Sequence, residues 1–213
     1  MDHTLEKILA RVQKPGRYVG GEYNAIKKEK NDVDCRFAFC FPDTYEIGMS
    51  NLGMRILYGV INEMDGVWCE RVFAPWGDME AEMRKEGLPL YALESGDPIA
   101  EFDIIGFSLG YEMAYTNVLN MLELGGIPLL SKDRREEDPI ILGGGPCAYN
   151  PEPVADFFDI FSIFFCLRRS QRFSSLYSVC FSIRSASGYG IIIVFPIILR
   201  AIFALGFFSF GAR

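Results

Sequence analysis

The sequence predicts an α/β domain built on an open, doubly wound, mostly parallel sheet of five strands. Three observations predict this fold class. Short apolar runs alternate with segments whose apolar residues recur at helical spacing. Glycine or proline ends most of these segments. Half of the 213 residues are hydrophobic and 23% are charged, which excludes an intrinsically disordered chain.

The elements are expected in the following order. A short amphipathic helix over residues 4–13 ends at Lys14-Pro15-Gly16, and a polar connection follows. Helices are then expected over residues 52–61, 78–86 and 115–124. The first of these carries an apolar stripe of Leu52, Ile56, Leu57, Val60 and Ile61. The five expected strands are residues 33–41, 67–73, 103–109, 138–142 and 156–163.

The distribution of charge divides the chain near residue 163. Residues 1–163 hold 15 Lys and Arg against 28 Asp and Glu, a net charge of −13, whereas residues 164–213 hold six Arg and no acid, a net charge of +6. The acidic part argues against direct nucleic-acid binding. We therefore expect an N-terminal helix and connection (1–31), an α/β domain (32–163) and an anomalous tail (164–213) that is irregular or an apolar helix.

Two interpretations of the tail differ in kind. Its abrupt loss of Asp, Glu and Lys is typical of a shifted reading frame or an assembly error, which is the interpretation we prefer. Alternatively, residues 189–211 are apolar and long enough to anchor the chain in a membrane, although Arg200 and Pro196 oppose this. The N-terminus lacks a secretory signal, so we expect a cytoplasmic protein, with the membrane as the alternative location.

Cysteine and histidine usage limits the possible chemistry. The single histidine, His3, excludes a histidine-based catalytic triad. No cysteine pair has C-x-x-C spacing, so no metal ligand is predicted within this chain, and no catalytic residue is predicted either. The six cysteines, expected to be reduced and mostly buried, are Cys35, Cys40, Cys69, Cys147, Cys166 and Cys180.

Three loops that follow expected strands are candidates for ligand binding. They are residues 43–48 (DTYEIG), 108–111 (SLGY) and 143–146 (GGGP). Ligands of open α/β sheets bind at the carboxyl ends of the strands, and glycine lets a ligand approach the backbone closely. The alternative function for Asp43 is to cap the following helix.

Four longer runs resemble the N-terminal part of cobalamin-binding-domain radical SAM proteins. The resemblance covers about residues 15–163 and includes CFPDTYEIGMSNLGMRILYGVINE, WCERVFAPWGDMEAEMR, ALESGDPIAEFDIIGFSL and IILGGGPCAYNPEPVADFFD. It implies a flavodoxin-like, cobalamin-binding type of α/β domain that precedes a radical SAM barrel. In the intact family that barrel uses S-adenosylmethionine and a [4Fe–4S] cluster. The cofactor-binding residues that the resemblance and the loops imply are Asp43, Thr44, Tyr45, Gly48, Ser108, Leu109, Gly143, Gly144 and Gly145.

Two departures from the family pattern change the expectation. Tyr45 stands where the D-x-H-x-x-G motif of cobalamin domains has its histidine, so cobalamin is expected to bind without a histidine ligand to cobalt. No C-x-x-x-C-x-x-C run is present to hold the cluster, so this chain without the missing barrel is expected to be inactive. The alternatives are a non-catalytic flavodoxin-like module that binds a nucleotide or a partner protein, and a membrane-anchored product with no ligand.

Overall fold

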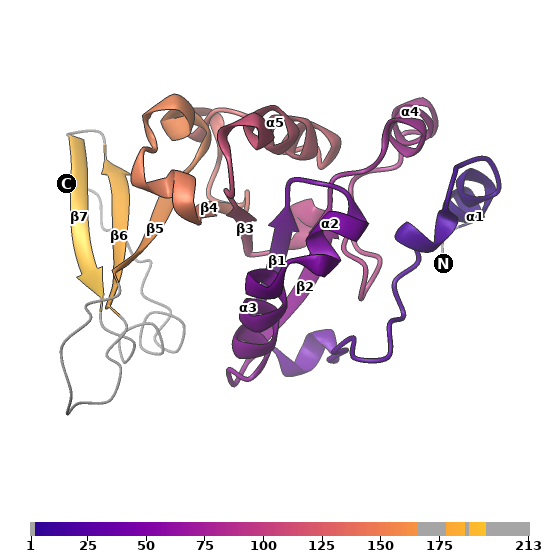
Figure 1. Cartoon of the computed structure of the whole chain (residues 1–213), viewed down its shortest axis with the longest axis horizontal. Coiled ribbons are helices and arrows are strands. Elements are labelled where there is room, and N and C mark those ends of the chain that lie inside the picture. The colour runs from indigo at the N-terminus through magenta and orange to yellow at the C-terminus, as the bar shows by residue number, and fades with distance from the viewer. Residues whose placement is uncertain (1–2, 166–177, 186–187, 195–213) are drawn as a thin grey trace.

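The computed structural model describes residues 3–165, 178–185 and 188–194 (Figure 1). Its sheet has the strand order β2-β1-β3-β4-β5-β6-β7. The first five strands pair in parallel, and their order is that of a flavodoxin-like, doubly wound sheet, as predicted. These strands are β1 (Cys35–Phe41), β2 (Val67–Phe73), β3 (Ile104–Ser108), β4 (Ile140–Gly144) and β5 (Ile160–Phe165).

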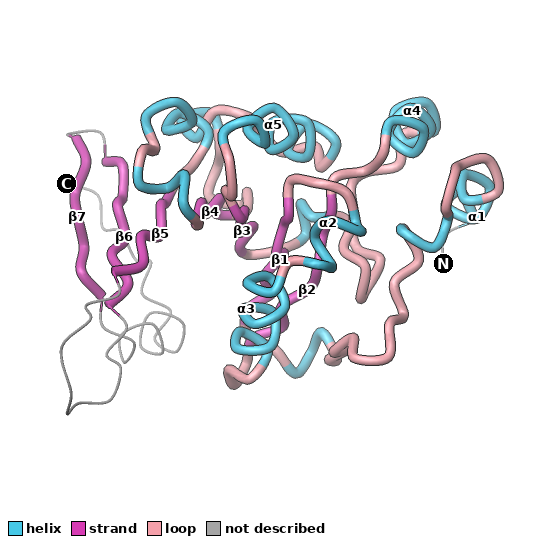
Figure 2. Tube along the Cα trace, viewed as in Figure 1, coloured by secondary structure: helices cyan, strands magenta, loops and turns pink. Residues whose placement is uncertain are grey.

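The helices follow the predicted order, with one addition (Figure 2). A short helix, α2, occupies the loop after β1, where the sequence analysis expected no helix. The helices are α1 (His3–Leu9), α2 (Tyr45–Ser50), α3 (Leu52–Asn62), α4 (Gly77–Glu86) and α5 (Tyr115–Leu124).

The described part of the tail corrects the expectation of an irregular or helical segment. Strands β6 (Ser178–Ser185) and β7 (Gly188–Val194) extend the sheet by antiparallel pairing beyond β5. Together they contain several Ile, Val and aromatic residues, which favour strands over helices. Most of the alternative membrane segment, residues 195–211, lies outside the described residues. Among the helices that are described, none has the length and apolar character needed to cross a bilayer.

The two faces of the sheet are covered by different helices. On one face, α1, α4 and α5 pack on a core that includes Ala38 and Cys40 of β1. On the other face, α3 packs against Phe37 and Phe39. Alternate residues of β1 therefore enter opposite cores, as expected for a parallel strand that is buried on both faces.

Helix α3 does not bury the apolar stripe that its sequence displays. Its buried residues are Met54, Tyr58 and Asn62, at intervals of four. The stripe residues Leu52, Ile56, Leu57 and Val60 are exposed instead, and Ile61 is half-buried. The helix is apolar on two sides, and the side that packs on the sheet is the one carrying Met54 and Tyr58.

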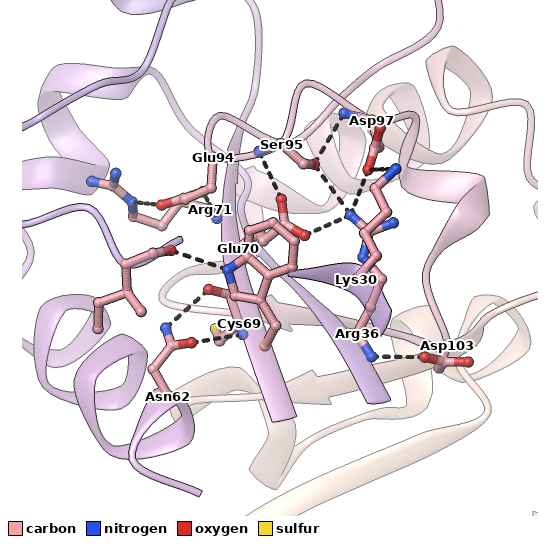
Figure 3. Close-up of polar contacts among 12 residues, drawn as sticks. Lys30, Arg36, Asn62, Cys69, Glu70, Arg71, Glu94, Ser95, Asp97 and Asp103 are labelled. Carbon is pink, nitrogen blue, oxygen red and sulfur yellow. Dashed lines mark hydrogen bonds and ion pairs between the residues drawn. The ribbon is translucent and has the colours of Figure 1, made fainter. Parts of the chain in front are cut away.

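The outer edge of β2 is protected by side chains and by a loop rather than by another strand. Asn62 accepts a hydrogen bond from the Cys69 N–H (3.0 Å) and donates one to the Cys69 carbonyl (2.9 Å), as Figure 3 shows. Further along the strand, Lys28 donates to the Val67 carbonyl (2.5 Å). The Leu93 N–H donates to the Arg71 carbonyl (2.9 Å). These bonds satisfy edge groups that would otherwise be open to pairing with another strand.

Replacing Asn62 with leucine is expected to lower the free energy of unfolding by about 2–4 kcal/mol. The substitution leaves the N–H and carbonyl of Cys69 buried without their partners. The measurement is urea-induced unfolding followed by circular dichroism. The matched control is Asn31→Leu at an exposed position, which should change stability by no more than about 0.5 kcal/mol. Equal unfolding midpoints for the two variants would show that Asn62 does not stabilise this edge.

Candidate functional site

The candidate site lies at the carboxyl edge of the sheet, where the strand order reverses. Strand β1 lies between β2 and β3, so the chain leaves β1 toward one side and returns on the other. At such a switch point the loops after two neighbouring strands diverge and leave room for a ligand. Residues 42–44 follow β1 there, and residues 109–112 follow β3.

Asp43 joins these two loops. The Tyr111 hydroxyl donates a hydrogen bond to Asp43 Oδ2 (2.5 Å), and the Thr44 N–H donates to Asp43 Oδ1 (2.7 Å). The bond to this carboxylate raises the pKa of Tyr111, because it stabilises the neutral phenol. Thr44, rather than Asp43, is the N-cap residue of α2, so the capping alternative for Asp43 is wrong. Asp43 instead holds the loops after β1 and β3 together.

Asn117 is a further residue of this junction, and the sequence analysis did not select it. It lies in α5, and its side-chain amide donates to the Pro42 carbonyl (3.0 Å). The first turn of α5 is thereby tied to the loop after β1.

Tyr45 is directed toward the N-terminal segment. Its hydroxyl donates a hydrogen bond to Glu22 Oε1 (2.7 Å), and its ring lies edge-on to Phe73 with centroids 5.3 Å apart. Burial, and then the neighbouring Glu22 carboxylate, raise the pKa of Tyr45 to about 12. Gly48, one turn further along, is buried where an added Cβ would overlap the Phe73 ring, so its small size serves packing.

The loops after β3 and β4 are connected by backbone hydrogen bonds. The Leu109 N–H donates to the Gly144 carbonyl (2.6 Å), and the Leu109 carbonyl accepts from the Cys147 N–H (3.1 Å). Leu109 is fully buried, whereas Ser108 at the end of β3 is half-buried. The two loops thus form one rigid part of the edge.

Glycine occupies three consecutive positions at the end of β4, and the physical reason differs from one position to the next. A Cβ on Gly143 would lie 2.9 Å from the Phe161 ring, so Gly143 serves packing. Gly145 has φ +104° and ψ −176°, a conformation available essentially only to glycine. A Cβ on Gly144 would lie no nearer than 3.9 Å to any atom outside its immediate neighbours, and its φ is not in the left-handed region. Gly144 is therefore the glycine that neither packing nor backbone conformation accounts for.

A rim of exposed apolar side chains surrounds this edge, and the sequence analysis did not identify it. Each member lies in a loop or short helix that follows one of the first four strands, and their exposed fractions run from 43% for Tyr111 to 85% for Met113. Large apolar residues in post-strand loops were the available signal. The members of the rim are Ile47 after β1, Trp76 after β2, Tyr111 and Met113 after β3, and Tyr149 after β4.

Two further observations concern what this edge can hold. A cavity of about 20 Å³ lies beside Thr44, Tyr45 and Trp76, which is room for one water but not for a cofactor. No group of three or more His, Cys, Asp and Glu within the described ranges is arranged to hold a metal ion. A ligand at this edge would therefore lie on the rim and in the junction between the loops.

Comparison with known proteins identifies the family. The sequence family described as "Radical SAM proteins, N-terminal" matches residues 53–164, which is just over half of the chain. A relative from Methanocaldococcus jannaschii, named as an uncharacterized protein, is 28% identical over 129 residues. The match covers 59% of this chain and 23% of the relative, so the chain spans about a quarter of that protein's length. No solved structure matches. The family match includes β2, α4, β3, α5 and β4 in full, and on this evidence the chain belongs to the family of radical SAM proteins, N-terminal.

Proposed function

We propose that this domain is the corrinoid-binding N-terminal module of a radical SAM enzyme and that cobalamin lies at the carboxyl edge of its sheet. The observation that carries the proposal is the exposed apolar rim, whose members follow the adjacent strands β2, β1, β3 and β4 on both sides of the switch point. Soluble domains seldom expose several large apolar side chains together unless the surface binds something. A corrin macrocycle offers a broad face of matching character, with amide groups around its margin.

The residues at the junction suit the polar parts of such a ligand. The Asp43 carboxylate and the Ser108 hydroxyl lie at the ends of neighbouring strands β1 and β3 and would bind amide groups of the corrin margin. Gly144 leaves space on the adjoining strand for the nucleotide tail to approach the backbone. These residues, together with the neighbouring loops, form the proposed binding surface.

Tyr45 is a poor candidate for a cobalt ligand. Its phenol is held by Glu22, and its raised pKa keeps it neutral at physiological pH. A neutral phenol coordinates cobalt poorly, so the lower face of the corrin is proposed to keep its own base or a water molecule. When bound, cobalamin supplies a cobalt centre that can exchange methyl groups or electrons.

This chain is proposed as a binding module rather than as a complete enzyme. A radical SAM reaction requires three thiolates to hold its cluster, and the sequence has no C-x-x-x-C-x-x-C run. The reaction and its substrate would belong to a barrel domain that acts together with this one. For that enzyme, the domain would hold the corrinoid and present one face of it to the barrel.

The test is retention of hydroxocobalamin by the full-length chain on a desalting column, followed by visible absorbance. We expect stoichiometric retention, with a spectrum that shows no coordination by a protein imidazole. Placing a charge in the rim, as in Trp76→Asp and Met113→Asp, is expected to weaken binding by at least about tenfold. The matched control is Leu129→Asp, an exposed apolar position at the opposite edge of the sheet, which should bind as the wild type does.

Circular dichroism of each variant separates loss of binding from loss of folding. Failure of the folded wild type to retain the corrinoid would overturn the proposal. Equal retention by the rim variants and Leu129→Asp would remove the carboxyl edge as the site. Retention of a flavin in place of the corrinoid would favour the flavodoxin-like nucleotide module.

A further inference from the structure

The N-terminal segment reaches the carboxyl edge of the sheet through residues 13–18, which precede the part of the chain that the family matches. The Gln13 N–H donates a hydrogen bond to Asp78 Oδ2 (2.6 Å), in the first turn of α4. The Tyr18 hydroxyl accepts one from the Trp76 N–H (3.2 Å). The loop after β2 is therefore held at two points by a segment that is distant from it in the sequence.

Arg17 connects this loop with the loop after β1. Its Nε donates to Glu46 Oε1 (2.8 Å), and its Nη2 lies 2.7 Å from the same oxygen. Its guanidinium lies over the Trp76 ring, with Cζ 5.6 Å from the ring centroid, which is within the range of a cation–π contact. Although it is charged, the Arg17 side chain is only 13% exposed. Glu46 lies in α2 directly before the rim residue Ile47, so one guanidinium links rim members that follow two adjacent strands.

The backbone at Lys14 is strained beside this contact. Lys14 has φ 51° and ψ 62°, and no other residue with a Cβ in the described ranges has a positive φ. Such conformations persist where the surrounding contacts enforce them, and they cluster at functional sites. The enforcing contacts here are the bond of Gln13 to α4 on one side and that of Arg17 to α2 on the other. The Lys14 Nζ also lies 3.4 Å from Glu46 Oε1.

We infer that Arg17 is a positioning residue of the corrinoid site, which fixes the indole of Trp76 as one wall of the surface on which the corrin lies. This inference rests on the proposed function. Trp76 is 52% exposed, so the part that Arg17 leaves open is available to a ligand. An exposed side chain that moves among rotamers must be ordered when a ligand binds, and this lowers the affinity. The contact with Arg17 orders the indole beforehand and thereby removes that cost.

The first experiment measures the dissociation constant of hydroxocobalamin for the full-length chain by equilibrium dialysis and visible absorbance. Arg17→Gln removes the cation but keeps most of the side chain, and it should weaken binding about three- to tenfold. The same change is then made in a Trp76→Leu chain, which has no ring for Arg17 to position. There it should alter the dissociation constant by no more than about twofold, because the two residues act as a unit.

The second experiment follows the indole itself, without corrinoid. The chain has two tryptophans, and Trp68 is only 4% exposed, so quenching of tryptophan fluorescence by acrylamide reports mainly on Trp76. Arg17→Gln should increase the quenching, because the guanidinium no longer covers part of the ring. Glu46→Ala should act in the same direction, since it releases Arg17 from α2 while leaving Arg17 itself unchanged.

The matched control is Arg11→Gln, in the same N-terminal segment. Arg11 pairs with Glu82 and Glu86 of α4, neither of which belongs to the rim, so its loss should change neither quenching nor affinity. Thermal unfolding shows which variants are folded.

The outcomes separate this inference from the proposed function. A folded wild type that binds no corrinoid would overturn both. A wild type that binds, with equal affinity in Arg17→Gln, would overturn the inference alone. Unchanged quenching in Arg17→Gln, or a loss of affinity that persists in the Trp76→Leu chain, would also overturn it, because Arg17 would then not act through the indole.

Discussion

Replacing Arg71 with methionine is expected to lower the free energy of unfolding by about 3–5 kcal/mol. The guanidinium lies at the protected edge of β2, where its Nε donates to Glu94 Oε1 (2.5 Å) and its Nη2 donates to Glu22 Oε2 (2.7 Å). The Glu94 side chain is fully buried, and Figure 3 shows it directed at Arg71. Without Arg71, Glu94 would remain as a buried charge with no countercharge, and this is the main cost.

A second substitution tests that explanation. Glu94→Gln removes the charge but keeps an oxygen for the backbone N–H of residue 71, which donates to Glu94 Oε2 (2.7 Å). Added to Arg71→Met, it should recover at least about half of the lost stability. Recovery of stability would distinguish the loss of a countercharge from a simple loss of packing.

The pH dependence gives an independent test. Burial raises the pKa of Glu94 above its ordinary value of 4.5, although Arg71 opposes the rise. Because the folded-state pKa lies above the unfolded one, this carboxyl favours folding at low pH, and its contribution is lost as the pH rises through the folded-state pKa. Removing Arg71 raises that pKa further. The stability difference between Arg71→Met and the wild type should therefore shrink as the pH falls from neutral to mildly acidic.

Urea-induced unfolding at each pH measures these differences, and Arg84→Met is the matched control. Arg84 also pairs with two carboxylates, those of Glu80 and Glu123, but at an exposed surface. Its loss should cost no more than about 1 kcal/mol. Similar losses at Arg71 and Arg84, or a deficit that does not change with pH, would contradict the account of Glu94.

Replacing Gly145 with alanine is expected to cost about 2–3 kcal/mol and to disturb the candidate site. Its φ of +104° is unfavourable for any residue with a Cβ, and that Cβ would lie 2.8 Å from the Leu109 carbonyl oxygen. The same carbonyl accepts the Cys147 N–H, so relieving the contact must loosen the connection between the loops after β3 and β4. Corrinoid retention should weaken together with stability.

The adjacent glycine provides the control for this substitution. Gly144→Ala adds the same methyl group one residue earlier, where the nearest atom beyond its neighbours is 3.9 Å away. Its stability should stay within about 0.5–1 kcal/mol of the wild type. Thermal and urea unfolding of the pair give the comparison, and equal stability of the two variants would show that the backbone at Gly145 is not constrained as described.

Much of the fold was predictable because strand patterns that alternate with helix patterns along a sequence are typical of a parallel, doubly wound sheet. Strand β2 and helix α5 occupy the residues that their periodicity predicts, 67–73 and 115–124. Helix α2 was not predictable in the same way, because its six residues are too few to show a helical period. It is formed where Gly48 lets the helix pack directly on Phe73.

The candidate site was predictable in position but not in detail. Asp43 and Ser108 lie at the carboxyl ends of the neighbouring strands β1 and β3, as the strand pattern predicted, and binding of a ligand there stays a prediction. Motif spacing could not show that Tyr45, two residues after Asp43, turns to Glu22 in the N-terminal segment. That contact joins residues 23 positions apart, and no local pattern encodes it.

Helix α3 separates what the local sequence pattern predicts, namely the helix itself, from what only the tertiary structure decides, namely the side of the helix that is buried. Periodicity was sufficient to predict a helix over residues 52–61, because recurring apolar residues define a helical period without reference to the rest of the chain. It could not determine which side faces the sheet, since both Met54 and Tyr58 on one side and Leu52, Ile56 and Val60 on the other are apolar. Packing against β1 and β2, together with the Asn62 hydrogen bonds to Cys69, decides the rotation of α3 and places Met54 and Tyr58 in the core. Only the tertiary structure therefore shows that most of the predicted apolar stripe is exposed to solvent and not buried in the core.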